Sequence, residues 1–351
     1  MTSLCSKLMR GALVTLTLVA AHARAESLVL ANYGGAWATL LKTVCTDPFM
    51  KETGINVTQA STGDSLAQIR VQQTTGNVLW DISPTEGASL PVAQDNKWLL
   101  PIAWKIVDPD NKLAPIARQP YAIGAIAYTT ALAYRTDKVP PGKKFNGWND
   151  FWDTKNFPGP RSLRDSPMEN LEFALIADGV PVNRVYEALK APGGIDRAFR
   201  KLDKIKPAIT VWWTTGQQPV QLLATGDAYY VTAFNGRISQ LQRENVPVSI
   251  VWNGGSQTVS YYSIQKGAQN PKAAMQFMKF CWNDPQRLAQ IARGLPYSGF
   301  NADMYKYLSA DEAKALPTAS VNAPLQFTFD ANFWAAHQKE LFARWQAWRL
   351  K

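Results

Sequence analysis

Apolar runs alternate with helical patterns from the start of the region that follows residue 26. The run Leu28–Leu30 is followed by helix-like apolar spacing over 37–50, and a second run begins at Ile55. The stretch "GDSLAQIRVQQ" predicts a helix before a third apolar run, "LWDIS" at 79–83. Strands separated by helices are typical of a parallel sheet covered on both faces, so this pattern predicts an α/β fold.

The turns after the first and third predicted strands are candidates for ligand contact. They are Asn32-Tyr33-Gly34-Gly35 and Pro84-Thr85-Glu86-Gly87. Because parallel strands end at the same edge of a sheet and ligands bind beyond those ends, we expect the two turns to share one rim.

A long extended segment divides the chain. Residues 119–141 are rich in Tyr, Thr and Ile, and a segment of that length can leave one sheet and join another, with the crossing near 124–132. A second α/β set follows, with predicted strands in "PRSLR", "ITVWWTT", "DAYYVTAFNGR" and "VSIVWN". The strand "SQTVSYYSIQKGA" and two helices split at Asp284-Pro285 then lead back. We expect a first lobe of 26–125 and 259–300, and a second lobe of 126–258 and 301–351 with the C-terminal helices.

The N-terminus has the pattern of an export signal. Lys7 and Arg10 precede an apolar stretch at 11–21 that is too short to span a bilayer. The small-x-small motif Ala23-Arg24-Ala25 predicts cleavage after Ala25 and export to the periplasm. Because Cys5 precedes the apolar stretch, lipid attachment at the cut is not expected.

Cleavage would leave about 326 of the 351 residues and lower the formal net charge from +10 to about +7. A chain of that length favours two lobes. The basic residues are scattered, which indicates a solvated surface and no nucleic-acid partner. No later apolar run has the length of a transmembrane helix.

Cysteine and histidine limit the available chemistry. Only Cys45, Cys281 and His337 would remain after cleavage, which excludes a zinc site of the usual Cys/His type. The two cysteines either form a disulfide, as an oxidising compartment allows, or stay as buried free thiols on two apolar helices. Both alternatives are open at this point. No cofactor is expected.

The order of these pieces resembles one known family. The segments that carry the resemblance are "FMKETGINV", "WDISPTEGASLPVAQDNKWLLPI", "PYAIGAIAY", "GWNDFWDTKNFPGPRSL", "LLATGDAYYVTAFNGR" and "YYSIQKGAQNPKAAMQFMKF". In order and spacing they resemble the periplasmic solute-binding proteins of ABC importers, in the spermidine/putrescine-binding branch. The resemblance implies a type II fold of two mostly parallel α/β lobes joined by crossing strands. It also implies a monomer that binds a small solute in a cleft and delivers it to a membrane permease and ATPase complex.

The resemblance also implies binding residues, because polyamine binders hold a methylene chain between aromatic rings and the amines on carboxylates. In the first lobe Tyr33 falls where the family has a tryptophan, Gly34 lets backbone approach the solute, and Thr85 and Glu86 lie on a contact loop. Elsewhere the candidates are Asp165, Glu169, Trp213, Phe234, Asn235, Arg237, Ser260 and Tyr297. Strand alternation sends Trp212 and Trp213 to opposite faces and does not say which one faces the cleft.

The departures from the family pattern point to a smaller ligand. Ser166 and Ser260 replace expected carboxylates, and Phe234 and Thr258 replace tryptophans. A polyamine needs negative charge at both ends of a long slot. Glu169 with Glu86 or Asp165, and Arg237 for a carboxylate, suit a ligand such as γ-aminobutyrate or a diamine ahead of spermidine.

Two other functions are weighed against binding of an amine. A ferric-ion binder of the same fold would use adjacent tyrosines, for which Tyr229-Tyr230 and Tyr261-Tyr262 are candidates. An exported hydrolase would need an acid and a base facing the cleft, such as Glu86 and Glu169. Because nothing marks a nucleophile, the prediction is a binding protein without catalytic residues.

Overall fold

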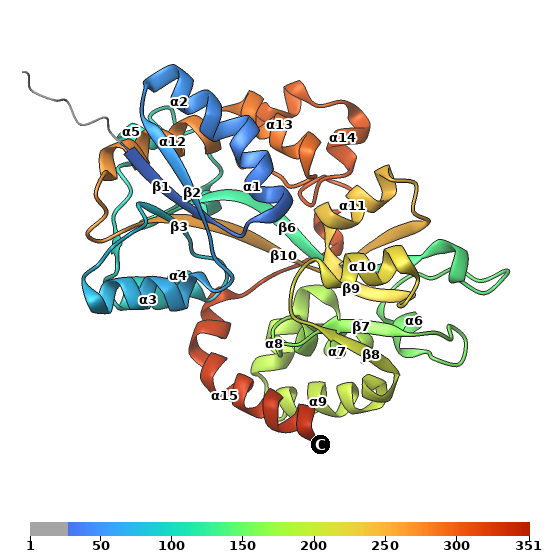
Figure 1. Cartoon of the computed structure of the whole chain (residues 1–351). Helices are drawn as coiled ribbons and strands as arrows, with labels where there is room; N and C mark the ends of the chain where they lie inside the picture. Colours follow the sequence, from blue (N-terminus) through green and yellow to red (C-terminus); the bar gives the residue numbers. More distant parts are fainter. Residues whose placement is uncertain (1–26) are drawn as a thin grey trace, which may run out of the picture.

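Two α/β lobes share one mixed sheet in the computed structural model, which describes residues 27–351 (Figure 1). The expected signal peptide and its cleavage after Ala25 fall outside the described residues. The sheet has eleven strands, with the main order β2-β1-β3-β10-β6-β9-β7-β8. Within 27–351, no helix is both long enough and apolar enough to cross a membrane.

The first lobe begins with the predicted strand and helix alternation. Its elements are β1 (Ser27–Asn32), α1 (Gly35–Leu41), the π-helical turn η1 (Lys42–Thr46), α2 (Asp47–Thr53), β2 (Asn56–Ser61), α3 (Ser65–Thr75), β3 (Ile82–Pro84), α4 (Ser89–Asp95), β4 (Leu99–Leu100), α5 (Trp104–Val107) and β5 (Arg118–Gln119). Strands β2 and β3 both pair with β1 in parallel. The turns after β1 and β3 therefore lie at one edge of the sheet, as expected.

The second lobe is built around β9, β7 and β8, which are parallel to one another. Its elements are α6 (Trp148–Trp152), β7 (Arg161–Arg164), α7 (Asn170–Ala177), α8 (Val185–Lys190), α9 (Gly194–Ile205), β8 (Ile209–Trp213), α10 (Gln218–Thr225), β9 (Tyr230–Phe234) and α11 (Asn235–Arg243). The remaining elements are α12 (Pro271–Trp282), α13 (Pro285–Gly294), α14 (Ala310–Lys314), β11 (Phe327–Thr328) and α15 (Ala331–Leu350).

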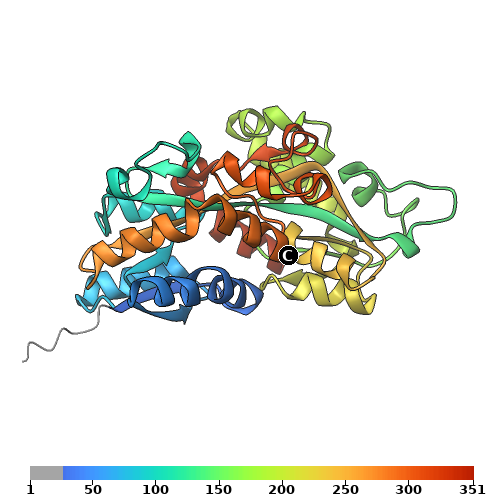
Figure 2. The same ribbon diagram turned by 90° about the horizontal axis from the view of Figure 1, so that it is seen from above.

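Two long antiparallel strands connect the lobes (Figure 2). They are β6 (Ala122–Arg135) and β10 (Val248–Gln265), which pair along most of their length. The stretches "VSIVWN" and "SQTVSYYSIQKGA", predicted as separate strands, are both parts of β10, with an irregular register between Val251 and Ser256. Because β6 and β10 run antiparallel, each lobe has a mixed sheet, in which only the outer strands are parallel.

Each lobe has its own hydrophobic core, and the change between them falls within β6. Ile126 and Ala127 pack in the core of the first lobe, whereas Leu132 packs in the core of the second. The C-terminal region does not all pack as expected. Met304 and Leu316 pack with Leu288 of α13, so the start of 301–351 lies on the first lobe, and α15 then packs on the second.

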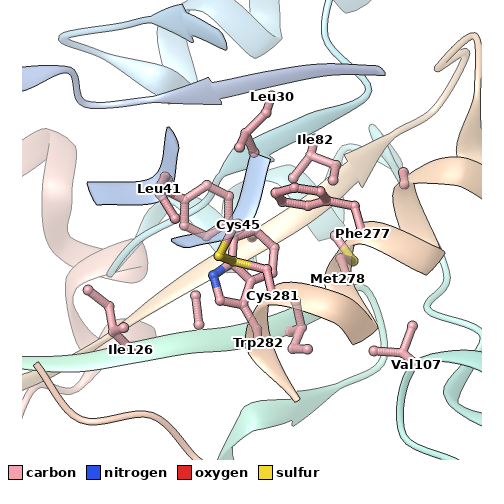
Figure 3. Close-up of a cluster of buried hydrophobic side chains, with 14 of the residues drawn as sticks. Leu30, Leu41, Cys45, Ile82, Val107, Ile126, Phe277, Met278, Cys281 and Trp282 are labelled. Carbon is pink, nitrogen blue, oxygen red and sulfur yellow. A yellow bond between two sulfur atoms is a disulfide. The ribbon is translucent and has the colours of Figure 1, made fainter. Parts of the chain in front are cut away.

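The first core contains both remaining cysteines (Figure 3). Cys45 of η1 and Cys281 of α12 are joined by a disulfide, with Cα atoms 5.3 Å apart and a sequence separation of 236. Both are fully buried. The structure therefore has the disulfide, and not the pair of free thiols that the sequence left as the alternative.

Candidate functional site

A partly buried carboxylate lies where the first lobe meets the crossing strands. Glu86 lies in the turn between β3 and α4. Its Oε1 accepts a hydrogen bond from Ser260 Oγ of β10 at 2.5 Å, and its Oε2 accepts one from Tyr128 OH of β6 at 3.1 Å. Loss of solvent raises the pKa of Glu86, although these hydroxyl donors oppose the shift.

The second lobe contributes a second carboxylate beside a cation. Glu169 directly precedes α7 and is 4% exposed, with a left-handed φ of 69° that is unusual for a side chain other than glycine. Its Oε2 lies 3.6 Å from Nη1 of Arg164, the last residue of β7. Burial raises the pKa of Glu169, while the charge of Arg164 lowers it.

Two hydroxyl groups with no bonding partner lie near this second carboxylate. Within 27–351, Glu169 Oε2, Thr130 Oγ1 of β6, and Ser256 Oγ and Thr258 Oγ1 of β10 are buried without a hydrogen bond. Thr130 and Ser256 lie opposite each other in the strand register, and both lower the pKa of Glu169. They are therefore near its carboxylate, although not in hydrogen-bonding geometry. Buried polar atoms are seldom left unpaired, so this group has capacity for a bound ligand or water.

Aromatic rings form a row beside the carboxylates, each meeting the next edge-on. Tyr297 lies 6.2 Å from both Trp37 and Tyr128, and Phe234 lies 5.4 Å from Tyr128 and 5.8 Å from Trp213. Such a row offers apolar surface to a methylene chain.

Tyr33 and Tyr297 both respond to the charge of Glu86. Tyr33 is 37% exposed, yet loss of solvent at its hydroxyl and then the charge of Glu86 raise its pKa. Burial raises the pKa of Tyr297 to about 12, with a smaller contribution from Glu86. The two tyrosines are therefore near Glu86.

Residues 45–320 match the family model described as bacterial extracellular solute-binding protein. The chain belongs to this family. A γ-aminobutyric acid-binding protein of Pseudomonas aeruginosa is 32% identical over 335 residues, covering 95% of this chain and 93% of the relative. The family resemblance inferred from the sequence is thus confirmed, and so is the function of a solute-binding component of an ABC importer.

Solved structures of similar proteins agree with this assignment. An ABC transporter substrate-binding protein from Bradyrhizobium japonicum USDA 110 is 30% identical with a TM-score of 0.85, covering 92% of this chain and 99% of that one. A structure described as a GABA receptor is 31% identical with a TM-score of 0.81, covering 92% and 98%. These neighbours confirm the two-lobed type II fold. Solute-binding proteins of ABC importers bind small molecules and work with a permease, and the extracellular family implies export.

Some of the residues predicted to contact the ligand instead use their polar groups for hydrogen bonds within this solute-binding protein. Thr85 Oγ1 shares a hydrogen bond with Ser263 Oγ at 2.8 Å, and the Gly34 N–H donates to Asn32 Oδ1 at 2.7 Å. The N–H of Gly34 is therefore used within the protein and is not free to donate to a ligand. The Asn235 amide likewise bonds backbone groups, accepting from the Thr129 N–H and donating to the Pro296 carbonyl.

Contacts with α15 show where Asp165 and the pair Trp212-Trp213 point. Asp165 Oδ1 accepts hydrogen bonds from Trp345 Nε1 at 2.8 Å and from Arg349 Nε at 3.2 Å, so it faces this helix and does not join the two glutamates. Trp212 packs edge-on against Trp345, whereas Trp213 packs against Phe234 and lies under the guanidinium of Arg164. Trp213 is thus the member of the pair that borders the site.

Arg237 lies at the margin of the aromatic row. It is in the first turn of α11, and its Nη1 donates to Gln217 Oε1 at 2.9 Å. Its charge lowers the pKa of Tyr297. One guanidinium nitrogen is held by protein, and the group keeps further donors for an anion.

The Tyr261-Tyr262 pair does not favour the ferric alternative. Tyr261 OH donates to the Ile116 carbonyl, while Tyr262 OH accepts from Trp37 Nε1. Tyr261 and Tyr262 are neighbouring residues of β10 and point to opposite faces, so their hydroxyls do not converge. In the described part of the chain, no three His, Cys, Asp or Glu side chains gather as a metal site.

Sequence reasoning missed several residues of the site. Tyr128 and Thr130 are two apart on the crossing strand, so their side chains leave the same face. Arg164 ends strand β7 at the edge of the sheet where ligands bind, so its position in the sequence could have identified it as a site residue. Ser256 and Trp37 could not have been identified in this way, because their places at the site depend on the register of β10 and on the packing of α1.

Proposed function

We propose that this protein captures a small zwitterionic amine, of the γ-aminobutyrate class, between its two lobes. The observation that carries the proposal is the buried, incompletely bonded Glu169 carboxylate beside Arg164, facing a row of aromatic rings. The γ-aminobutyric acid-binding relative supports the ligand class.

The amine of the ligand binds at Glu169. An ammonium group has three donors, and the unpaired Glu169 Oε2 with the hydroxyls of Thr130 and Ser256 supplies three acceptors. Glu86 adds negative charge from the first lobe, so the ammonium contacts both lobes. A buried carboxylate that gains a charge-assisted hydrogen bond is stabilised more than one that bonds a neutral donor.

The carboxylate of the ligand binds at Arg237. Its guanidinium has donors beyond the one given to Gln217, and a planar guanidinium suits a carboxylate in bidentate geometry. Arg164 partly neutralises Glu169 in the free protein. The rings of Tyr33 and Phe234 then pack on the methylene groups between the charged ends.

A diamine such as putrescine is the second candidate. The observation in its favour is the presence of two carboxylates, Glu86 and Glu169, at the site. Each would take one ammonium, but a diamine leaves Arg237 without an anion. The protein binds the solute as a monomer without chemical change and passes it to a permease and ATPase complex at the inner membrane.

A thermal-shift screen of the mature protein tests this proposal. Binding to the folded state raises the melting temperature by mass action. We expect γ-aminobutyrate to give the largest rise among amino acids, diamines and polyamines. No rise with any amine, or an equal rise with butyrate, would contradict the proposal.

A further inference from the structure

Asn235 closes a gap between two backbone ladders on one edge of the crossing strand β6. From Tyr134 to Thr130 this edge pairs with β9, which ends at Phe234. Further along, Ala127 pairs with Ser298, which donates and accepts backbone hydrogen bonds of 3.0 and 2.7 Å. Between the two ladders, the Thr129 N–H donates to Asn235 Oδ1 at 2.9 Å.

The other end of the same side chain reaches the segment that follows α13. Asn235 Nδ2 donates to the Pro296 carbonyl at 2.7 Å, and Asn235 is fully buried. Leu295 and Tyr297 flank that carbonyl and belong to the core of the first lobe. Ile238 and Leu241 of α11 belong to a separate core beside β9. One amide therefore links the crossing strand, the first lobe and the start of α11.

Close packing reinforces this link. A Cβ placed on Gly236 would lie 2.6 Å from the ring of Tyr297, so the ring rests directly on the backbone of α11. Phe234 precedes Asn235, and both Phe234 and Tyr297 contact the Tyr128 ring. The backbone that carries the Asn235 amide thus also carries Phe234 and lies against the ring of Tyr297.

We propose that Asn235 is a positioning residue that sets the resting angle between the lobes and the placement of Phe234 and Tyr297, without touching the ligand. Its amide has a donor and an acceptor that are both used by backbone groups, so no other side chain of its size satisfies Thr129 and Pro296 together. Losing these bonds leaves buried backbone groups unpaired, and relative movement of the two lobes relieves that cost.

The test measures the separation of the lobes without ligand, so its outcome does not depend on the proposed function. Spin labels are attached at Lys51→Cys of α2 and Lys204→Cys of α9, which are exposed positions on opposite lobes. The mature protein is used, which lacks Cys5, and Cys45 and Cys281 are paired with each other and do not react. Pulsed electron resonance then gives the distance distribution in the parent, Asn235→Ala and Asn235→Asp. The aspartate keeps the acceptor for Thr129 and loses the donor to Pro296.

Asn301→Ala is the matched control. Asn301 is 4% exposed and also uses its amide on backbone groups, accepting from Asp303 and donating to Asn283, but within the first lobe. We expect both Asn235 variants to broaden or shift the distribution, and Asn301→Ala to leave it as in the parent. If Asn235→Ala does not fold, Asn235→Asp carries the comparison, because it keeps the acceptor for Thr129 and loses only the bond to Pro296.

A second readout, which rests on the proposed function, is the dissociation rate of γ-aminobutyrate. We expect it to rise about tenfold in Asn235→Ala, the effect of losing one to two buried hydrogen bonds, and to stay unchanged in Asn301→Ala. Folded Asn235 variants whose lobe distances match those of the parent would overturn the inference. Absence of γ-aminobutyrate binding by the parent would instead overturn the proposed ligand.

Discussion

Arg164 Nη1 and Glu169 Oε2 are 3.6 Å apart, which is an ion-pair distance too long for a hydrogen bond. The Glu169 side chain is 5% exposed, whereas that of Arg164 is 38% exposed and stacks over Trp213. The buried carboxylate is therefore balanced in charge and incompletely bonded. A ligand ammonium supplies the missing donors, so this pair is the centre of the proposed site.

The first prediction concerns the charge of Glu169. Glu169→Gln keeps the shape of the side chain and removes its charge, so γ-aminobutyrate should bind about tenfold to a hundredfold more weakly. Calorimetric titration measures the dissociation constant. Glu187→Gln is the control, because Glu187 forms an ion pair with Arg184 on the exposed surface of α8. Equal affinities of parent and Glu169→Gln would remove Glu169 from the site.

The second prediction concerns the pH dependence of binding. Loss of solvent raises the pKa of both Glu86 and Glu169, so they protonate at higher pH than ordinary glutamates. The amine of γ-aminobutyrate stays charged in this range, and the protonated carboxyls hold it poorly. Affinity should therefore begin to fall at a pH above the 4.5 at which an ordinary glutamate titrates, with proton release on binding as the carboxyls become protonated. Titrations in buffers of different ionisation enthalpy measure that release, and constant affinity from pH 7 down to 4.5 would be the contrary result.

The third prediction concerns a buried glutamate away from the site. Glu172 of α7 is fully buried, and its Oε1 accepts hydrogen bonds from Tyr186 of α8 and Trp334 of α15. Burial raises its pKa from 4.5 to about 7. Because the folded state binds this proton more tightly than the unfolded state, the stabilisation is present below pH 4.5 and is lost as the pH rises towards 7. The loss is at most about 3 kcal/mol.

Glu172→Gln separates this contribution from other titrating groups. The amide keeps an acceptor for Tyr186 and Trp334 and does not ionise. Denaturant unfolding at pH 5 and pH 8 should show the variant gaining stability relative to the parent at the higher pH. If the difference in unfolding free energy between the two proteins is the same at both pH values, Glu172 does not titrate as stated.

The fourth prediction concerns the disulfide between Cys45 and Cys281. The bond closes a very long loop, so restriction of the unfolded chain stabilises the folded state by about 5.5 kcal/mol in the entropic account. Cys45→Ala with Cys281→Ala should lower the melting temperature and leave γ-aminobutyrate affinity nearly unchanged, because the bond lies in the first core. Thiol titration of denatured, secreted protein checks the pairing directly, and two free thiols per chain would exclude it.

Much of the fold follows from local patterns. The strand and helix alternation up to residue 84 and the Asp284-Pro285 break between α12 and α13 are readable because they depend on apolar spacing and proline chemistry. The single strand β10 was less readable, since Gly254 and Gly255 interrupt its pattern where the register with β6 shifts. Met304 and Leu316 show the same limit, because sequence order does not say which lobe a later segment packs against.

The site is predicted less completely than the fold. Glu86 and Glu169 follow from their places at strand and helix ends and from the family resemblance. The roles of Asp165 and Asn235 depend on partners far along the chain, in α15 and after α13. Such partners are set by tertiary packing, which apolar spacing does not encode. The aromatic row has the same origin, because its five rings come from five separate segments.

Calorimetric titration of the mature protein with γ-aminobutyrate and with butyrate tests the central claim most directly. Butyrate keeps the carboxylate and the methylene chain and lacks only the amine. We predict that γ-aminobutyrate binds with one site per chain and that butyrate binds at least a hundredfold more weakly, because Glu86 and Glu169 are then left without a cation. Butyrate binding as tight as that of γ-aminobutyrate would contradict a site built to hold an amine.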